Sequence, residues 1–353
     1  MKYIAYGFLM LWSVVRGWAF FPRACVQAIK GGGLLRWLRL TFTGLRYQRR
    51  EALPLLDKDM PGDKIHFLNT GNSDAILLES NGRFALIDAA EDSEYPAGQR
   101  SLAYPGWEDY VVDYVKRTAG DAQGKARLDF ILGTHAHSDH IGGFDTLLLD
   151  PDIEVGRAYL KPYDDSIMRP YEQCYWDNDI VHAQMTAALK VRNVPLIEDI
   201  PGETFMLGNF KITLYNRGKR SSGDENDNSI GVLVERGGQR AFLTGDINNI
   251  SGVEHELARE IGQVELLKAG HHGHNGSSTL AIAASMQPET VIFASRGKAS
   301  FWVLCRFILA GGTRQLLSTG RFGGIAAVFG ENKNKFEYYA IDEFATPLEA
   351  KGV

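Results

Sequence analysis

The sequence predicts a layered α/β body that follows an apolar, basic and helical N-terminal segment. From Lys64 onward, short apolar runs of strand length alternate with segments of helical periodicity. Residues 1–50 contain nine Lys or Arg and no Asp or Glu; the whole chain has a net charge of −5, so the remaining 303 residues carry −14. Three distant Cys exclude a disulfide framework and a Cys-x-x-Cys zinc site. We therefore divide the chain into an N-terminal segment, 1–55, and a body, 60–345.

The N-terminal segment is predicted to lie on an anionic membrane surface. Residues 4–15 are almost all apolar, but a membrane span needs about 20 residues. Apolar stretches with Trp and many Arg are typical of surface-bound helices. A cleaved secretory signal, a helical hairpin packed on the body and a nucleic-acid arm remain as alternatives. We expect a membrane-associated, secreted or cell-surface protein and leave a cytoplasmic location open.

The elements of the body follow from periodicity and turn signals. Asn81-Gly82 lies between two apolar runs and predicts a hairpin. Residues 107–120 repeat apolar side chains at helical spacing and end at Gly120. The expected strands are 65–68, 75–79, 84–88, 128–133, 210–215, 230–235, 240–244, 264–268 and 290–294, with a helix at 252–261 and a buried helix within 298–320.

Six of the nine His fall in two short clusters, and each cluster directly follows a predicted strand. The first cluster contains His135, His137, Asp139 and His140 within six residues. Imidazole and carboxylate are the ligands that catalytic zinc and similar ions prefer. His135 and His137 can face one ion, while Asp139 and His140 can face a second.

The second cluster is His271, His272 and His274, which follows the strand at 264–268. Between the clusters, Asp246 follows another strand, where its carboxylate can bridge two ions about 3.5–4 Å apart. A helix N-cap is the alternative role for Asp246. The sequence therefore predicts a site with two metal ions, built from loops that follow strands.

These motifs resemble the metallo-β-lactamase superfamily over residues 64–340. The resemblance implies an αββα sandwich with two Zn²⁺ ions at one edge. It implies that His135 and His137 bind one ion and that Asp139 and His140 bind the other. Asp246 would bridge them, His272 would complete the second ion with His271 close by, and Asp88 would orient a ligand.

One departure from the family pattern concerns the first ion. Many members carry a further His before the bridging Asp, but this chain has Asp224-Glu225-Asn226-Asp227-Asn228-Ser229 at that place. The first ion either lacks one protein ligand or takes an oxygen from this loop. We expect Asn228 to lie behind the direct ligands, as Asp88 does. The departure argues against a true β-lactamase.

Other stretches are similar to one branch of the superfamily. That branch contains teichoic-acid phosphorylcholine esterases and the hydrolase domain of DNA-uptake (competence) channel proteins. The similarity rests on the Lys-x-Gly-His-His-Gly motif at 268–273 and on stretches such as 73–82 and 159–163. It implies a phosphodiesterase acting on phosphorylcholine-type or related esters. For this chemistry we assign Asp139 and His274 as catalytic residues, with His274 or His271 as the proton donor.

A choline leaving group would need aromatic faces and nearby carboxylates. Trp176, Tyr163 and Tyr175 are the candidates, and Lys161 is a candidate phosphate ligand. The alternative is that these side chains only pack a loop or face solvent. The body's −14 charge disfavours a long polyanion, but the basic N-terminal segment keeps nucleic acid open as a partner. The remaining alternatives are a nuclease or nucleotide phosphodiesterase and a non-enzymatic metal-binding partner protein.

Overall fold

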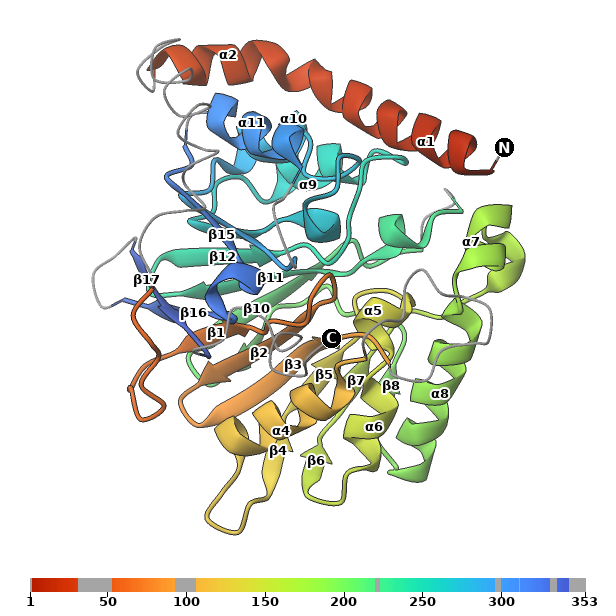
Figure 1. Cartoon of the computed structure of the whole chain (residues 1–353), viewed down its shortest axis with the longest axis vertical. Helices are drawn as coiled ribbons and strands as arrows, with labels where there is room; N and C mark the ends of the chain where they lie inside the picture. Colours follow the sequence, from red (N-terminus) through yellow and green to blue (C-terminus); the bar gives the residue numbers. More distant parts are fainter. Residues whose placement is uncertain are drawn as a thin grey trace.

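Two β-sheets pack face to face, and helices cover both outer faces (Figure 1). The computed structural model describes residues 2–30, 53–92, 106–219, 223–295, 300–310, 312–330 and 335–342. The four layers confirm the predicted αββα sandwich.

The first sheet has eight strands in the order β17-β16-β1-β2-β3-β5-β7-β8. Asn81 and Gly82 join β2 to β3 with positive φ angles of 48° and 70°, which Asn and Gly adopt more readily than other residues. From β3 to β8 the neighbouring strands are parallel. The strands are β1 (Lys64–Phe67), β2 (Ala75–Ser80), β3 (Arg83–Ala89), β5 (Phe130–Leu132), β7 (Ala158–Tyr159), β8 (Leu196–Ile197), β16 (Ile325–Phe329) and β17 (Phe336–Ala340).

The second sheet has seven strands in the order β15-β14-β13-β12-β11-β10-β9. Its strands are antiparallel from β9 to β12 and parallel from β12 to β15. They are β9 (Phe205–Leu207), β10 (Phe210–Tyr215), β11 (Gly231–Arg236), β12 (Gln239–Leu243), β13 (Leu266–Lys268), β14 (Thr290–Phe293) and β15 (Gln315–Ser318). A separate pair consists of β4 (Ala126–Leu128) and β6 (Ile153–Val155).

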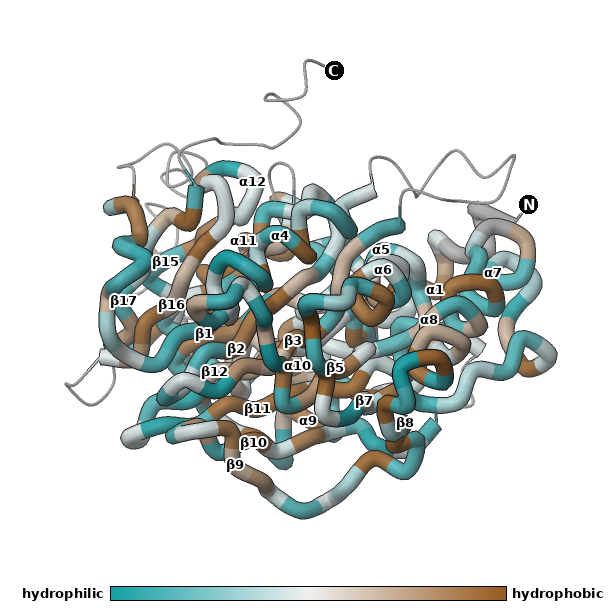
Figure 2. Tube along the Cα trace, turned by 90° about the horizontal axis from the view of Figure 1, so that it is seen from below, coloured by the Kyte–Doolittle hydropathy of each residue, from teal (hydrophilic) through white to brown (hydrophobic). Residues whose placement is uncertain are grey.

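The central core lies between the two sheets. Strands of both sheets contribute fully buried side chains to it, among them Ile65, Phe130, Phe210 and Val232. In Figure 2 the hydrophobic residues follow the strands, while hydrophilic residues occupy many of the connections. Because burial of one such side chain contributes about 1.5–3 kcal/mol, this core fixes the two sheets against each other.

Amphipathic helices form the two outer layers. Val111 and Val115 of α4 are fully buried in the core under the first sheet, as their helical spacing predicts. The helices on the first sheet are α4 (Glu108–Ala119), α6 (Phe144–Leu149) and α8 (Asn178–Val191); those on the second are α9 (Val253–Glu260), α10 (Leu280–Met286) and α11 (Phe301–Ala310). Short helices are α5 (Ser138–Ile141), α7 (Pro170–Tyr175), α12 (Thr319–Phe322), η2 (Asp165–Ile167), η3 (Glu225–Asn228) and η4 (Gly270–Gly273).

The N-terminal helices lie across the second helical layer. α1 (Lys2–Gly17), η1 (Trp18–Phe20) and α2 (Phe21–Lys30) pack on α10 and α11, and α1 also contacts α7 (Figure 1). Ala24 is fully buried against Leu280 and Ala284. Among the described helices, none has the length and apolarity needed to cross a bilayer. The described part of the segment therefore forms the packed arrangement that was one alternative; residues 31–52 lie outside the described residues.

Two sequence expectations were wrong in detail. The expected single strand at 128–133 is split, because Asp129 leaves the ladder and accepts a 2.6 Å hydrogen bond from Arg83 Nε. The expected buried helix within 298–320 occupies only α11 in the described residues. The run that follows forms β15 instead, because it pairs in parallel with β14.

Candidate metal centre

The predicted ligands come from the carboxyl ends of four strands, two in each sheet. Asp88 lies near the end of β3, and the 134–140 loop follows β5. Asp246 follows β12, and the 270–278 loop follows β13. β3 and β5 are parallel, as are β12 and β13, so their carboxyl ends meet at one edge of the sandwich.

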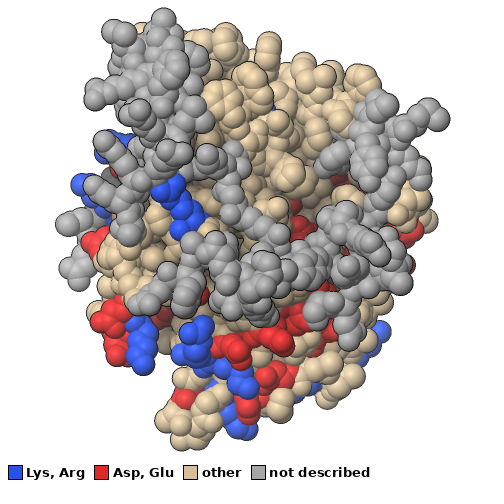
Figure 3. All heavy atoms as spheres, viewed as in Figure 1, with Lys and Arg blue, Asp and Glu red and all other residues tan. Residues whose placement is uncertain are grey.

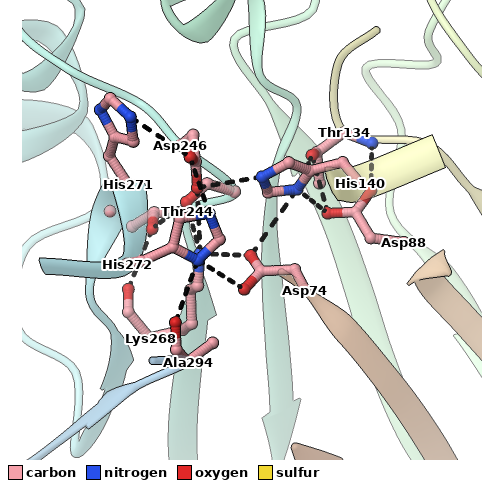
Figure 4. Close-up of polar contacts among 12 residues, drawn as sticks. Asp74, Asp88, Thr134, His140, Thr244, Asp246, Lys268, His271, His272 and Ala294 are labelled. Carbon is pink, nitrogen blue, oxygen red and sulfur yellow. Dashed lines mark hydrogen bonds and ion pairs between the residues drawn. The ribbon is translucent and has the colours of Figure 1, made fainter. Parts of the chain in front are cut away.

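Four side chains converge into one cluster, and three of them, His140, Asp246 and His272, are labelled in Figure 4. The donor atoms of Asp139, His140, Asp246 and His272 all lie within 4.8 Å of one another. Nε2 of His272 is 3.1 Å from Oδ2 of Asp139 and 3.2 Å from Oδ2 of Asp246. Nε2 of His140 is 3.3 Å from Oδ1 of Asp246. The structure thus brings together the predicted ligands of the second ion.

This cluster fits a divalent metal ion. Nε2 of His140 is buried and makes no well-formed hydrogen bond within the described part of the chain. Burial alone would lower the pKa of His140, but the carboxylates of Asp246, Asp88 and Asp139 outweigh it and hold the pKa well above its usual value. Two imidazoles and two carboxylates form a donor set that first-row divalent metals prefer, and binding would displace the imidazole protons.

Asp88 orients one ligand from behind the cluster. Its Oδ2 accepts a 2.7 Å hydrogen bond from Nδ1 of His140, and its Oδ1 accepts a 2.7 Å bond from the backbone N–H of Thr134. The bond to Nδ1 leaves Nε2 of His140 directed at the cluster. On the other side, Nδ1 of His272 lies 3.0 Å from the carbonyl oxygen of Ala294 and can donate to it.

A buried ion pair that we did not predict supports the cluster. Lys268 is completely buried, and its Nζ pairs with the carboxylate of Asp74 while donating a 2.8 Å hydrogen bond to the carbonyl of Gly245. The same Nζ is 3.3 Å from Oδ1 of Asp246. The sequence offered one signal, because Lys268 is a charged residue at the end of an otherwise apolar strand. Only the fold reveals that Asp74 is its partner.

His135 and His137 lie beside this cluster but outside it. Nε2 of His135 is 3.0 Å from Nδ1 of His137, and Nε2 of His137 is 3.0 Å from Oε2 of Glu172. Burial would lower the pKa of His137, but Glu172 raises it to about 9. Among the described residues, the two groups of neighbouring metal donors are the cluster above and a set of Asp74, Asp88 and His140. Neither contains the predicted ligand pair of the first ion.

The loop in place of the missing His offers a hydroxyl rather than Asn228. Oγ of Ser229 is 3.2 Å from Nδ1 of His135 and accepts a 3.1 Å hydrogen bond from the backbone N–H of Asp246. Asn228 instead donates a 2.8 Å bond to Oε2 of Glu225. An oxygen of this loop therefore lies beside His135, while the expected place of Asn228 behind the ligands stays a prediction.

The two other His residues of the second sequence cluster, His271 and His274, lie at the rim of the metal cluster. Nε2 of His271 is 3.9 Å from Oδ2 of Asp246, and burial lowers the pKa of His271 to about 3. The ring of His274 stacks on that of His271 with centroids 4.8 Å apart. His271 and His272 both have left-handed backbone angles, with φ of 48° and 50°, which turn their side chains away from a regular helix.

The predicted substrate residues have different surroundings. The ring of Trp176 lies 6.1 Å from that of His137, at the edge of the site. Tyr163 packs near His182, and its hydroxyl donates a 2.9 Å bond to Asp165. Lys161 is buried and donates to the carbonyls of Asn216, Gly218 and Asn228, an arrangement that favours a loop-holding role. The side chain of Tyr175 lies outside the described residues.

Buried carboxylates surround the Trp176 side of the site. Glu172, Glu225, Asp177 and Glu91 are all buried. Burial together with the nearby carboxylate of Asp139 raises the pKa of Glu91 well above its usual value. Burial also raises the pKa values of Asp177 and Glu225. This wall is rich in carboxyl groups, and burial favours the neutral form of Glu91, Asp177 and Glu225. The sequence alone did not reveal it because its members come from separate loops.

The fold and the cluster together define a metallo-β-lactamase-type domain with a candidate metal site. A family model described as "Beta-lactamase superfamily domain" matches residues 86–294, so the chain belongs to that superfamily.

Three curated relatives are similar to this chain at 23–24% identity. They are ComE operon protein 3 of Bacillus subtilis (strain 168), 23% identical over 66% of this chain; Recombination protein 2 of Haemophilus influenzae, 24% over 69%; and Competence protein ComA of Neisseria gonorrhoeae, 23% over 77%. This chain covers 28%, 25% and 32% of their respective lengths. These relatives confirm the predicted similarity to competence proteins.

Proposed function

We propose that the protein is a metal-dependent phosphodiesterase. The observation that carries this proposal is the cluster of Asp139, His140, Asp246 and His272, which offers two imidazoles and two carboxylates to one ion. Zinc is the proposed metal. A second zinc ion would be held by His135 and His137, with Asp246 as a further ligand.

A bound divalent ion supplies a Lewis acid that polarises a phosphoryl oxygen and lowers the pKa of water. The chain's own residues orient the side chains that bind the ion, and one of them supplies a proton to the leaving group. Asp88 and Ala294 fix the two imidazoles of the cluster, and Asp74 donates its backbone N–H to the carbonyl of Asp139 at 3.1 Å. In hydrolysis a water oxygen bonds to phosphorus and that water releases one proton to the solvent, the ester P–O bond breaks, and the leaving alkoxide takes a proton. The exposed ring of His274 at the rim is the proposed donor.

The ring of Trp176 at the edge of the site supports a substrate with a cationic leaving group. A quaternary ammonium there would face this aromatic ring, and the buried carboxyl groups of Glu172 and Glu225 would lie behind His137. A phosphorylcholine-type ester combines that cation with a phosphodiester. Nucleic acid is the second candidate, which the names of the competence relatives favour. The basic N-terminal segment would hold the protein at an anionic membrane surface.

Metal content and hydrolysis should be measured together on the purified full chain. The substrates are p-nitrophenyl-phosphorylcholine, bis-p-nitrophenyl phosphate and DNA. Asp246→Asn removes one ligand charge, and Asp113→Asn on the exposed face of α4 is the matched control. We expect bound metal and turnover in the wild type and in Asp113→Asn, and a loss of at least a hundredfold in Asp246→Asn.

The outcomes separate the candidates. Preference for the choline ester supports the esterase, while salt-dependent cleavage of DNA supports a nuclease. Stoichiometric metal without hydrolysis of any substrate would point to a non-enzymatic metal-binding partner protein. Absence of bound metal after purification with zinc would contradict the ligand assignment.

A further inference from the structure

An apolar cavity of about 600 Å³ lies between the N-terminal helices and α11. Met10 and Val14 of α1 line one side, and Trp302 and Leu309 of α11 line the other. Trp18 of η1 lies at the junction with α2. Its volume is within the usual range of about 300–1,000 Å³ for small-molecule sites. The lining is suited to a hydrocarbon rather than to a polar ligand.

The cavity adjoins the loop that carries the metal-site histidines. Asn275, next to His274, lines it. Gly276 packs so closely on Met10 that a Cβ on the glycine would lie 2.0 Å from the sulfur of Met10. Nη1 and Nη2 of Arg306 donate to the carbonyls of Ser277 and Asn275, which fixes this loop to α11. A ligand in the cavity would therefore have one end beside the catalytic loop.

The surface around the cavity is apolar. Trp18, Phe21 and Trp302 line it and are 62%, 49% and 63% exposed, and further exposed apolar side chains follow on α1. The upper part of the face in Figure 3, over α1, α10 and α11, carries few charged side chains, whereas Lys, Arg, Asp and Glu crowd the lower part. The charges on the described part of α1 and α2 are all basic and include Arg16 and Arg23. Exposed apolar side chains on helices whose charged residues are basic are typical of surfaces that contact an anionic lipid layer.

We infer that the cavity binds the acyl chain of a lipid-borne phosphodiester whose head group reaches the metal centre. This inference rests on the proposed function and narrows its substrate class to lipid head-group esters. The chain would lie between α1 and α11, beside the exposed aromatic side chains. The phosphodiester would pass Asn275 toward His274 and the metal cluster. The N-terminal helices are then part of the substrate site as well as a surface anchor.

A series of glycerophosphocholine esters with acyl chains of two, eight and twelve carbons tests this inference below the micellar concentration. Burial of one methylene corresponds to about 0.8 kcal/mol, or about fourfold in kcat/KM. We expect kcat/KM to rise at least tenfold from the two-carbon to the eight-carbon ester. Val14→Trp should fill the cavity, and Val15→Trp is the matched control because Val15 is exposed and does not line it.

We expect Val14→Trp to reduce the ratio of kcat/KM for the twelve-carbon ester to that for the two-carbon ester at least tenfold, while Val15→Trp keeps the wild-type ratio. Thermal midpoints and metal content verify that both variants fold. Binding of a dansyl-labelled lysophosphatidylcholine, followed by direct dansyl excitation, is measured in parallel on Asp246→Asn. This inactive variant should bind the probe like the wild type, and addition of Val14→Trp should weaken binding at least tenfold.

The two proposals can fail separately. Equal kcat/KM for all chain lengths, with the short ester hydrolysed, would overturn the acyl site and leave the phosphodiesterase standing. Absence of hydrolysis with probe binding that depends on Val14 would overturn the phosphodiesterase and keep the acyl site. If the probe binds only after Leu34, Leu35 and Leu38 are changed to Ser, the cavity holds the chain's own segment and the inference is wrong.

Discussion

Replacement of Ser13 by Ala should loosen two loops of the metal centre from α1. Ser13 is completely buried, and its Oγ donates a 2.5 Å hydrogen bond to the carbonyl of Gly276. The same Oγ accepts a 2.8 Å bond from the backbone N–H of Asn249. Gly276 follows His274 by two residues, and Asn249 follows Asp246 by three. One hydroxyl therefore connects the N-terminal helix to both loops that carry the second half of the ligand set.

The expected magnitude follows from the two groups that the Ala variant leaves without a partner. An unsatisfied buried donor or acceptor costs about 1–3 kcal/mol, so the two groups left by Ser13→Ala should lower the free energy that holds α1 on the body by about 2–6 kcal/mol. Local opening should then appear before global unfolding, since elements open with separate free energies. Hydrogen exchange of the amides at 246–250 and 274–278 should accelerate at least tenfold.

Urea unfolding and hydrogen exchange provide the assay. Ser166→Ala is the control, because it removes an exposed hydroxyl whose partner is Asp164 in a surface turn. We expect no change in the exchange of either loop in that variant. Unchanged exchange in both loops of Ser13→Ala, together with an unchanged urea midpoint, would refute the reasoning.

Three further predictions concern charge and metal. Burial raises the pKa of Glu254 to about 7, so its stabilising contribution is full below about pH 4.5 and is lost as the pH rises through 7. Glu254→Gln keeps the acceptor for the N–H of Thr279 and should raise the unfolding free energy over wild type by about 3 kcal/mol at pH 8 but hardly at pH 5; an equal difference at both pH values would contradict this. Lys268→Met leaves the Asp74 carboxylate buried without its cation and should cost about 3–5 kcal/mol, and Asp74→Asn in the same chain should restore part of it in a double-mutant cycle. Zinc at a hundred times its Kd should raise the unfolding free energy by about 2.7 kcal/mol, and a chelator should reverse the gain; a midpoint indifferent to zinc would argue against the cluster as a metal site.

The sequence predicted most elements because local signals are strong in this chain. Asn81-Gly82 fixes a hairpin, and strand-then-loop boundaries place Asp246 and both His clusters at strand ends. The errors arose where tertiary pairing decided between structures. Asp129 leaves its strand to meet Arg83, and the run after α11 becomes an edge strand because β14 offers it a partner.

The candidate site was predictable where its residues are close in sequence and hidden where they are not. The His-x-His-x-Asp-His motif lies within one loop and can therefore be recognised from the sequence. Glu172, which pairs with His137, lies in a helix 35 residues further along the chain. Asp74 lies next to a strand of the first sheet and Lys268 in a strand of the second, so they pair only in the folded protein. Lys161 is a different case. Its charge suggested a ligand for the substrate phosphate, whereas its buried ammonium donates hydrogen bonds to three backbone carbonyls.

The origin of the four cluster residues gives the ion a further role as a cross-link between the two halves of the chain. Asp139 and His140 precede the connection from β8 to β9, while Asp246 and His272 follow it. A chain cut between Gly202 and Glu203, in an exposed part of that connection, would leave two ligands on each fragment. Reassembly of the fragments should therefore tighten with zinc, and a split protein of this design would report the ion through association rather than turnover.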